Sequence, residues 1–242
     1  MRPLIQPGIS QGVGRVTLGG VSLSATRGAW AGGQQYETLS DAVRVALSKA
    51  IAAPVSAEPL WASREQRIEW MTQMSDRLPR RHFPDFESRQ RFLRTVRYEA
   101  QRAGLEPELV LGLIQVESAF RQYAISSVGA RGYMQVMPFW TKVLGDGDAK
   151  RLFNPRINIR YGCVILRHYL DIEKGDLFLA LGRYNGSRGR DPYPNAVFAA
   201  WDRWRFQPGS RSHSRTADAE TAVPASVPRR ASAATGMPQP KP

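Results

Sequence analysis

One stretch of the sequence constrains the fold more than any other. Residues 109–120, Leu-Val-Leu-Gly-Leu-Ile-Gln-Val-Glu-Ser-Ala-Phe, form an apolar run that contains a single carboxylate, Glu117. At 3.6 residues per turn, every third or fourth residue lies on the same face of a helix. One face of such a helix is apolar along its length: Leu109, Leu113, Val116 and Phe120. The run therefore predicts a core helix with Glu117 at the edge of its apolar stripe.

The position of Glu117 has a chemical consequence. A carboxyl group at the edge of an apolar stripe is partly removed from water, which disfavours its charged form and raises its pKa. A group that donates a proton to a leaving group needs a pKa near the working pH. Glu117 is therefore the best candidate in the chain for a catalytic acid, although most glutamates at helix edges are solvated or paired with a base.

The rest of the chain also shows helical patterns. Ser40 is a suitable N-cap for a short helix over residues 41–52. A helix over residues 61–78 is expected to turn four side chains inward: Trp61, Ile68, Met71 and Leu78. Further helices are expected over six segments that Gly and Pro residues separate: 88–103, 107–120, 138–144, 156–173, 177–184 and 194–204. No segment alternates convincingly as a strand does, apart from a short ribbon within 125–136, so the sequence predicts an all-α fold.

Composition predicts how the chain is divided. A chain of 242 residues with 42% hydrophobic residues can bury one good core. We expect an accessory helical segment over 32–87, the main domain over 88–206, and a disordered tail over 207–242, where large apolar residues are nearly absent. The only cysteine, Cys163, falls on an apolar helix stripe and is expected to be buried.

The N-terminal residues give a weak signal. An apolar stretch over 16–25 is followed by Ala29-Trp30-Ala31, which resembles a signal-peptidase cleavage site. A degraded signal peptide over residues 1–31 and a wrongly assigned start codon explain this pattern about equally well. No apolar run approaches the roughly 20 residues that a transmembrane helix needs.

Charge favours some partners over others. The net charge of +13 is spread along the whole chain, and no motif typical of nucleic-acid binding is present, so no specific nucleic-acid partner is predicted. General basicity favours association with an anionic polymer. The three histidines are too scattered to predict a metal site.

Three short blocks together resemble a known enzyme family. They are Glu117-Ser118, the segment 132–138 (Gly-Tyr-Met-Gln-Val-Met-Pro), and 183–186 (Arg-Tyr-Asn-Gly). In order and spacing they are similar to the signature blocks of soluble lytic murein transglycosylases. The resemblance covers roughly residues 88–206 and implies a lysozyme-like, goose-type helical domain that cleaves peptidoglycan glycan strands.

The resemblance also implies roles for individual residues. Glu117 corresponds to the catalytic acid, which protonates the oxygen between N-acetylmuramic acid and N-acetylglucosamine and then acts as a base to form 1,6-anhydromuramic acid. Five residues correspond to substrate-binding positions: Ser118, Met134, Gln135, Tyr184 and Asn185. The family needs neither a cofactor nor a metal. The chain departs from the family at Arg183, where alanine is common, and at Tyr133, where leucine is common.

Several alternatives stay open at this point. Hydrolytic glycosidases usually need two carboxylates, and the next acidic residue after Glu117 is Asp146, outside the blocks. This absence favours a transglycosylase, but a hydrolytic muramidase and a catalytically weak glycan-binding or scaffolding module of the same fold remain alternatives. By its implied substrate we expect a monomer in the periplasm or elsewhere in the cell envelope. Whether a wall-spanning assembly uses the chain is left open.

Overall fold

A computed structural model describes residues 33–54 and 58–209. The chain divides into two units, Met1–Phe206 and Gln207–Pro242. The expected leader over 1–31 lies outside the described residues, and so does the expected tail apart from 207–209. Every helix of the described residues belongs to the first unit.

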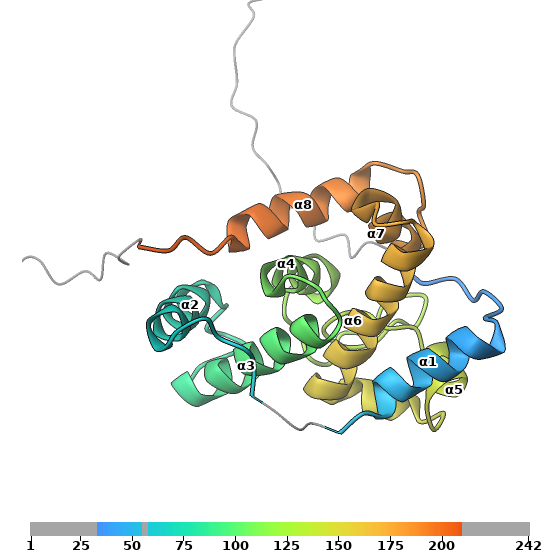
Figure 1. The fold of residues 1–242 in the computed structure, drawn as a ribbon, viewed down its shortest axis with the longest axis horizontal. Helices are drawn as coiled ribbons and strands as arrows, with labels where there is room; N and C mark the ends of the chain where they lie inside the picture. Colours follow the sequence, from blue (N-terminus) through green and yellow to red (C-terminus); the bar gives the residue numbers. More distant parts are fainter. Residues whose placement is uncertain (1–32, 55–57, 210–242) are drawn as a thin grey trace, which may run out of the picture. The chain divides into compact units, whose positions relative to one another are not determined.

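The described chain is helical throughout (Figure 1). Its elements are α1 (Asp41–Ala52), α2 (Arg64–Arg77), α3 (Phe86–Arg102), α4 (Pro107–Ser118), α5 (Phe139–Leu144), the 3-10 helix η1 (Ala149–Phe153), α6 (Pro155–Ile172), α7 (Leu177–Asn185) and α8 (Pro192–Trp204). In place of a strand, this part of the chain has two isolated bridges, which join Arg131 to Ile125 and to Val136. The predicted all-α class is confirmed, and the predicted short ribbon corresponds to these bridges.

Side-chain caps explain where several helices begin. The hydroxyl of Ser40 accepts a hydrogen bond from the Val43 amide at the start of α1, as the sequence predicts. The Asn154 side chain accepts from two amides at the start of α6, and Asp176 caps α7 in the same way. Gly186 ends α7 in a left-handed conformation with φ of 75°, which favours glycine.

Helix α4 lies in the middle of the fold, as predicted for the apolar run. Figure 1 shows it nearly end-on, with α8 on one side and α3 on the other. Helices α4 and α8 approach so closely that a Cβ atom on Gly112 would lie 2.7 Å from the Trp201 amide nitrogen. Glycine at position 112 therefore allows α8 to pack directly onto the helix that carries Glu117.

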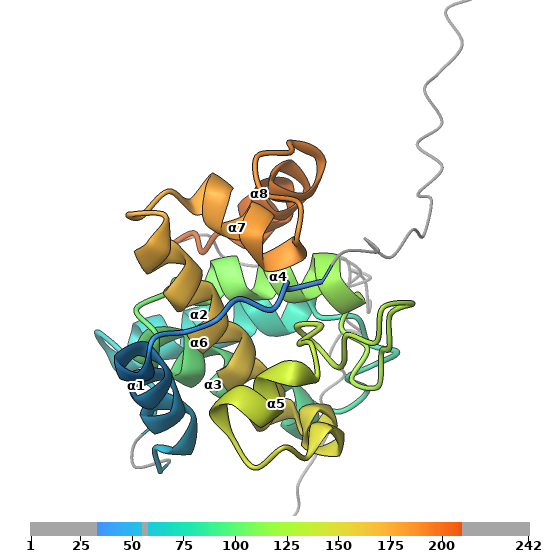
Figure 2. The same cartoon turned by 90° about the vertical axis from the view of Figure 1, so that its right-hand side faces the viewer.

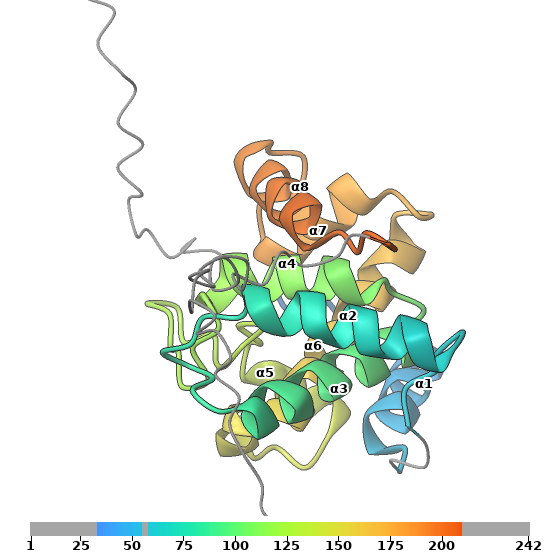
Figure 3. The same ribbon diagram turned by 90° about the vertical axis from the view of Figure 1, so that its left-hand side faces the viewer.

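Helix α2 packs against the same core (Figure 3). Trp70, Met71 and Met74 are buried, and the Trp70 indole donates a hydrogen bond to the Glu108 carboxylate in α4. The predicted inward position of Ile68 is wrong, because this side chain is 57% exposed. Met71 and Leu78 are buried as predicted, and Trp70 and Met74 complete the face that packs inward.

Two arginines hold the end of α1. The Arg160 guanidinium donates to the carbonyls of Ile51 and Ala53, and the Arg102 guanidinium donates to that of Ala50. Both arginines also form ion pairs with the buried Glu99 of α3. Cationic groups stabilise the C-terminal end of a helix, so this buried network fixes α1 against α3 and α6. Where the accessory segment ends and the main domain begins, near residue 88, stays a prediction.

Candidate active site

Glu117 lies in the last turn of α4, where the helix ends abruptly. The next two residues after Ser118, Ala119 and Phe120, have left-handed φ values of 49° and 63°. This conformation costs a non-glycine residue about 1–2 kcal/mol, and surrounding packing must hold it in place. Phe120 supplies such packing, since it is 4% exposed and lies against Phe92 and Trp204. The strained turn therefore sets Glu117 firmly at the end of a rigid helix.

The Glu117 carboxyl is more deeply buried than its place at the stripe edge suggested. The residue is 8% exposed, and its Oε1 accepts a hydrogen bond from the Tyr193 hydroxyl. Burial raises the pKa of Glu117 to about 8, although the hydrogen bond from Tyr193 lowers it. Glu117 therefore holds a proton at neutral pH, which is the state that a proton donor needs.

Tyr193 is a site residue that sequence analysis does not identify. It lies near the start of α8, is 1% exposed, and donates to a carboxyl 76 positions earlier in the chain. Burial raises its pKa well above the usual value, so it stays a neutral donor. The available signal was a tyrosine between Pro192 and Pro194 at a helix start, but nothing in that local pattern shows that α8 returns to α4.

Tyr184 connects α7 to the loop that follows α4. Its buried hydroxyl donates to the Met134 carbonyl at 2.8 Å. Burial, and then the charge of the Glu117 carboxylate, raise the pKa of Tyr184 well above its usual value. This electrostatic effect indicates that Tyr184 lies near Glu117, and its role in binding substrate stays a prediction.

The side chains of Met134 and Gln135 are directed into the protein. Met134 is fully buried under α6, where a Cβ atom on Gly162 would lie 2.4 Å from its sulfur. Gln135 has a φ of 47°, and its Nε2 donates to the Gly132 and Ala124 carbonyls. Both side chains therefore hold the shape of the 124–137 loop. The Gln135 carbonyl and the Met137 amide of this loop bond to the side chain of Gln34.

Ser118 and Asn185 lie at the two helix ends nearest the site. The Ser118 hydroxyl donates to the Ile114 carbonyl one turn earlier, at 3.1 Å, and the residue is 1% exposed. The Asn185 Nδ2 donates to the Ser187 hydroxyl, whereas its buried Oδ1 has no hydrogen-bond partner. A buried acceptor without a donor is costly, so Asn185 is the polar group here that is best placed to accept from a ligand.

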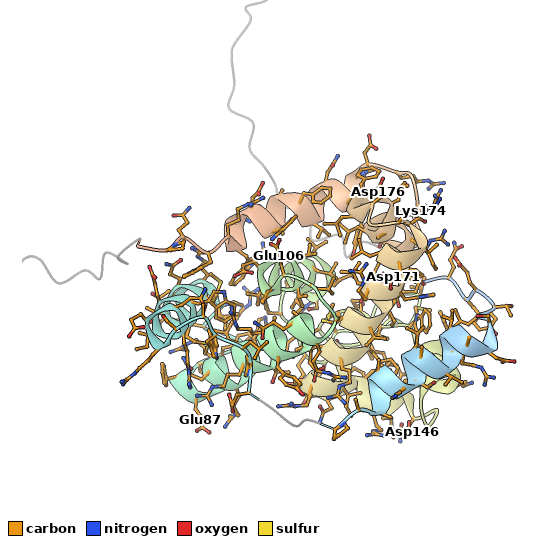
Figure 4. All side chains as sticks on the ribbon, in the orientation of Figure 1. Glu87, Glu106, Asp146, Asp171, Lys174 and Asp176 are labelled. Carbon is orange, nitrogen blue, oxygen red and sulfur yellow. The ribbon has the colours of Figure 1, made fainter. Side chains whose placement is uncertain are left out.

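Another carboxylate is not part of this arrangement. The two causes that shift the Glu117 pKa are burial and the Tyr193 hydroxyl. Asp146, the next acidic residue along the chain, lies at the margin of the fold beside α1 and α5 (Figure 4). Its side chain is 49% exposed and forms an ion pair with Arg151. Within residues 33–54 and 58–209, no cluster of three or more His, Cys, Asp or Glu side chains could hold a metal ion.

A cavity of about 510 Å³ opens beside the end of α4. Its lining includes Arg81, Arg121 and Tyr133, the position where the resembled family commonly has leucine. Burial raises the pKa of Tyr133 to about 12, so this hydroxyl stays neutral.

Part of the chain is similar to one family of known proteins. Residues 94–197 match the family model described as the transglycosylase SLT domain. A membrane-bound lytic murein transglycosylase C from Actinobacillus pleuropneumoniae serotype 5b (strain L20) is 43% identical over 83 residues, which are 31% of this chain and 23% of that protein. Its counterpart in Histophilus somni (strain 2336) is 38% identical over 115 residues, or 41% of this chain and 32% of that protein.

Two further proteins match part of the chain. The transglycosylase of Enterobacteria phage PRD1 is 39% identical over 92 residues, 38% of this chain and 33% of that protein. A crystal structure of an inactive mutant of lytic transglycosylase Slt from Pseudomonas aeruginosa matches 54% of this chain and 22% of that one, with 26% identity and a TM-score of 0.38. The chain therefore spans no more than a third of the length of these proteins. Among the described residues, no helix has the length and apolarity needed to cross a bilayer.

Proposed function

We propose, on the premise that residues 94–197 belong to the transglycosylase SLT family, that this chain is a peptidoglycan lytic transglycosylase. The bond cleaved is the β-1,4 bond between N-acetylmuramic acid and N-acetylglucosamine, and the product carries 1,6-anhydromuramic acid. One observation carries the proposal: Glu117 is buried, protonated at neutral pH, and paired with a neutral tyrosine instead of a second carboxylate. A site with one carboxyl group suits a reaction in which the substrate supplies the second functional group.

The first step is cleavage. Glu117 donates its proton to the glycosidic oxygen as the bond from that oxygen to C1 of the muramic residue breaks. The N-acetylglucosamine side leaves as an alcohol, and the 2-acetamido group of the muramic residue stabilises the positive charge at C1. Glu117 is then a carboxylate, and the Tyr193 hydroxyl hydrogen-bonds to it.

The second step closes the anhydro ring. A carboxylate with a pKa near 8 is a stronger base than an exposed one. Glu117 takes the proton of the muramic C6 hydroxyl while O6 attacks C1, so one residue returns to its starting state and no water is consumed. The burial that keeps Glu117 protonated at first thus also makes it an effective base afterwards.

The other residues divide into contact and positioning roles. We assign a substrate contact to Asn185, because its buried Oδ1 awaits a donor. We assign positioning to Ser118, Met134, Gln135 and Tyr184, whose side chains hold the loop and the helix ends around Glu117. The cell envelope is the proposed location, because peptidoglycan is found there and two of the relatives are named as membrane-bound murein transglycosylases.

Mass spectrometry of released muropeptides tests this function. Purified peptidoglycan is incubated with the full chain, with Glu117→Gln, and with Asp146→Asn as a matched control. We expect the full chain to release products lighter than hydrolytic ones by one water molecule, Glu117→Gln to release none, and Asp146→Asn to match the full chain. Reducing ends of full mass would instead indicate a muramidase, and glycan binding without release would indicate a binding module.

A further inference from the structure

A groove between α2 and α3 lies on a face of the fold that the proposed reaction does not use. The two helices run side by side at the front of Figure 3, and the groove between them has a volume of about 560 Å³. Figure 2 views the fold from the opposite direction, with α7 in front and α2 behind. The groove therefore lies away from α7, the helix that carries Tyr184 and Asn185.

Two large apolar side chains are exposed at this groove. Ile68 of α2 is 57% exposed, and Phe86, the first residue of α3, is 67% exposed. Both line the groove, beside the buried Met71. Single exposed apolar side chains are normal on a protein surface, whereas apolar side chains that gather into one patch mark a contact with another molecule. The groove is therefore a candidate for such a contact.

Three arginines border the same groove: Arg64 and Arg67 of α2, and Arg94 of α3. All three are exposed, and none of them forms an ion pair with another described residue. Within the part of the chain that the structure describes, one acidic residue lines the groove, Asp76. The groove therefore carries a net positive charge, which attracts an anionic partner.

Two other arginines of α3 already have partners within the fold. The Arg89 guanidinium donates to the Ser75 hydroxyl of α2 and to the Phe83 carbonyl, both at 2.9 Å. Arg91 forms an ion pair with Glu87, one turn earlier in α3. The Arg89 bonds fix α3 against α2, so the groove has a rigid frame. The guanidinium groups of the three unpaired arginines are left for an anion outside the protein.

We propose that the α2–α3 face, formed by Arg64, Arg67, Ile68, Phe86 and Arg94, docks on a phospholipid membrane that contains anionic lipids. The planar guanidinium groups bind lipid phosphates, and the two apolar side chains enter the boundary between headgroups and acyl chains. A bilayer accepts apolar side chains wherever they project, whereas a folded protein partner needs a matching pocket for each of them. The projection of both side chains therefore favours a membrane over an acidic protein.

Docking through this face goes beyond the proposed function, because it concerns the place of the chain in the envelope and not the bond that it cleaves. With α2 and α3 on the membrane, α7 lies on the side of the fold that faces away from the bilayer (Figure 2). Asn185, the proposed substrate contact, is the last residue of α7. Docking in this orientation therefore directs that end of the active site toward a polymer beyond the membrane surface.

Co-sedimentation with vesicles tests the α2–α3 face. The full chain is mixed with vesicles of phosphatidylcholine alone, or of phosphatidylcholine and phosphatidylglycerol in equal parts. We expect the chain to bind the anionic vesicles much more tightly than the neutral ones, and the bound fraction to fall as salt is added. Each basic residue at an anionic membrane strengthens binding roughly fivefold, so a variant carrying Arg64→Gln, Arg67→Gln and Arg94→Gln should bind the anionic vesicles roughly a hundredfold more weakly.

Two further variants separate the face from the basicity of the whole chain. Lys49→Gln, Lys142→Gln and Lys174→Gln together remove the same charge from exposed positions in α1, in α5 and after α6, on the side seen in Figure 2. This lysine variant should bind the anionic vesicles within about threefold of the unaltered chain, because salt screens distant charges. Phe86→Ala removes an apolar side chain and should weaken binding about tenfold at every salt concentration.

Several results would overturn the proposal. They are equal binding to neutral and anionic vesicles, no loss of binding in the arginine variant, and an equal loss in the lysine variant. Should the arginine variant fail to fold, Phe86→Ala decides alone, and unchanged binding by that variant overturns the membrane surface. Absence of vesicle binding would overturn it too, and binding of poly-glutamate that only the arginine variant loses would then assign the face to an acidic protein. Vesicles contain no glycan, so none of these results bears on the proposed lyase.

Discussion

Two enclosed glutamates of this protein have opposite acid-base properties. Glu117 is 8% exposed, and burial raises its pKa to about 8. The Glu173 side chain is 5% exposed, yet hydrogen bonds and charge from Arg188 and Arg183 lower its pKa to about 2. Glu117 lies deep in the protein with a tyrosine hydroxyl beside it, whereas Glu173 lies nearer the surface between two guanidinium groups. Depth and partner together therefore decide the outcome: the first carboxyl stays a proton donor, and the second stays an anion.

The difference matches what each glutamate does in the fold. Glu173 follows the end of α6 and binds Arg183 of α7 and Arg188 beyond it, so it fixes the connection between two helices. Arg183 in turn forms an ion pair with Glu37, in the segment that precedes α1. Arg183, at the position where the resembled family commonly has alanine, therefore pairs with two acids. At position 173 a charged carboxylate is useful because it holds the two arginines in place. At position 117 the charged form is useful only after the carboxyl group has donated its proton.

The largest effect is expected when the neutral partner of Glu117 is removed. Tyr193→Phe deletes the hydroxyl that hydrogen-bonds to the carboxylate formed by proton donation. Hydrogen bonds to charged groups contribute about 1.5–3 kcal/mol, so kcat/KM for muropeptide release should fall roughly ten- to a hundredfold. The lost bond lowers the Glu117 pKa in the native protein, so the alkaline limb of the pH–rate profile should move to higher pH.

A second tyrosine variant serves as a control, because it separates loss of the hydrogen bond to Glu117 from a non-specific loss of stability. Tyr98→Phe changes a buried tyrosine of α3, outside the site, and should leave both the rate and the profile as they are. A Tyr193→Phe enzyme with a reduced rate but an unmoved alkaline limb would show that Tyr193 supports the fold and not the acid. The comparison between the two glutamates would then have to rest on burial alone.

Stability should respond to Glu117 in a way that depends on pH. Between pH 4.5 and about 8 the folded chain keeps the Glu117 proton and the unfolded chain loses it, so the unfolding free energy falls as the pH rises through this window. A shift of this size is worth on the order of 3 kcal/mol at pH 7. Glu117→Gln, which cannot ionise, should therefore raise Tm by roughly 10 °C at pH 8. The gain should vanish near pH 4.5, and an equal gain at both pH values would exclude ionisation as its cause.

The sequence predicted the helices better than their contacts. Periodicity and capping residues located α1 and α4 because these signals are local: Ser40 caps the next turn, and the 109–120 run carries its own apolar stripe. Ile68 was misplaced because its periodicity fits a second face of α2, and only the positions of α3 and α4 select the face with Trp70. The link from Tyr193 to Glu117 joins residues 76 positions apart, and no local pattern encodes such a distance.

The smallest effect is expected at Glu173, with the opposite sign. Its lowered pKa contributes stability that is complete above pH 4.5 and is lost as the pH falls toward 2. Because the Arg188 side chain is 52% exposed, water screens the pair, and Glu173→Gln should cost about 1 kcal/mol at neutral pH, or 2–4 °C in Tm. The loss of stability should shrink below pH 4.5.

Glu87→Gln serves as a control. It breaks an exposed ion pair with Arg91 at the margin of the fold (Figure 4) and should change Tm by less. If Glu173→Gln instead stabilised the protein at pH 8, burial would outweigh the arginines there, and the two glutamates would differ in degree and not in kind.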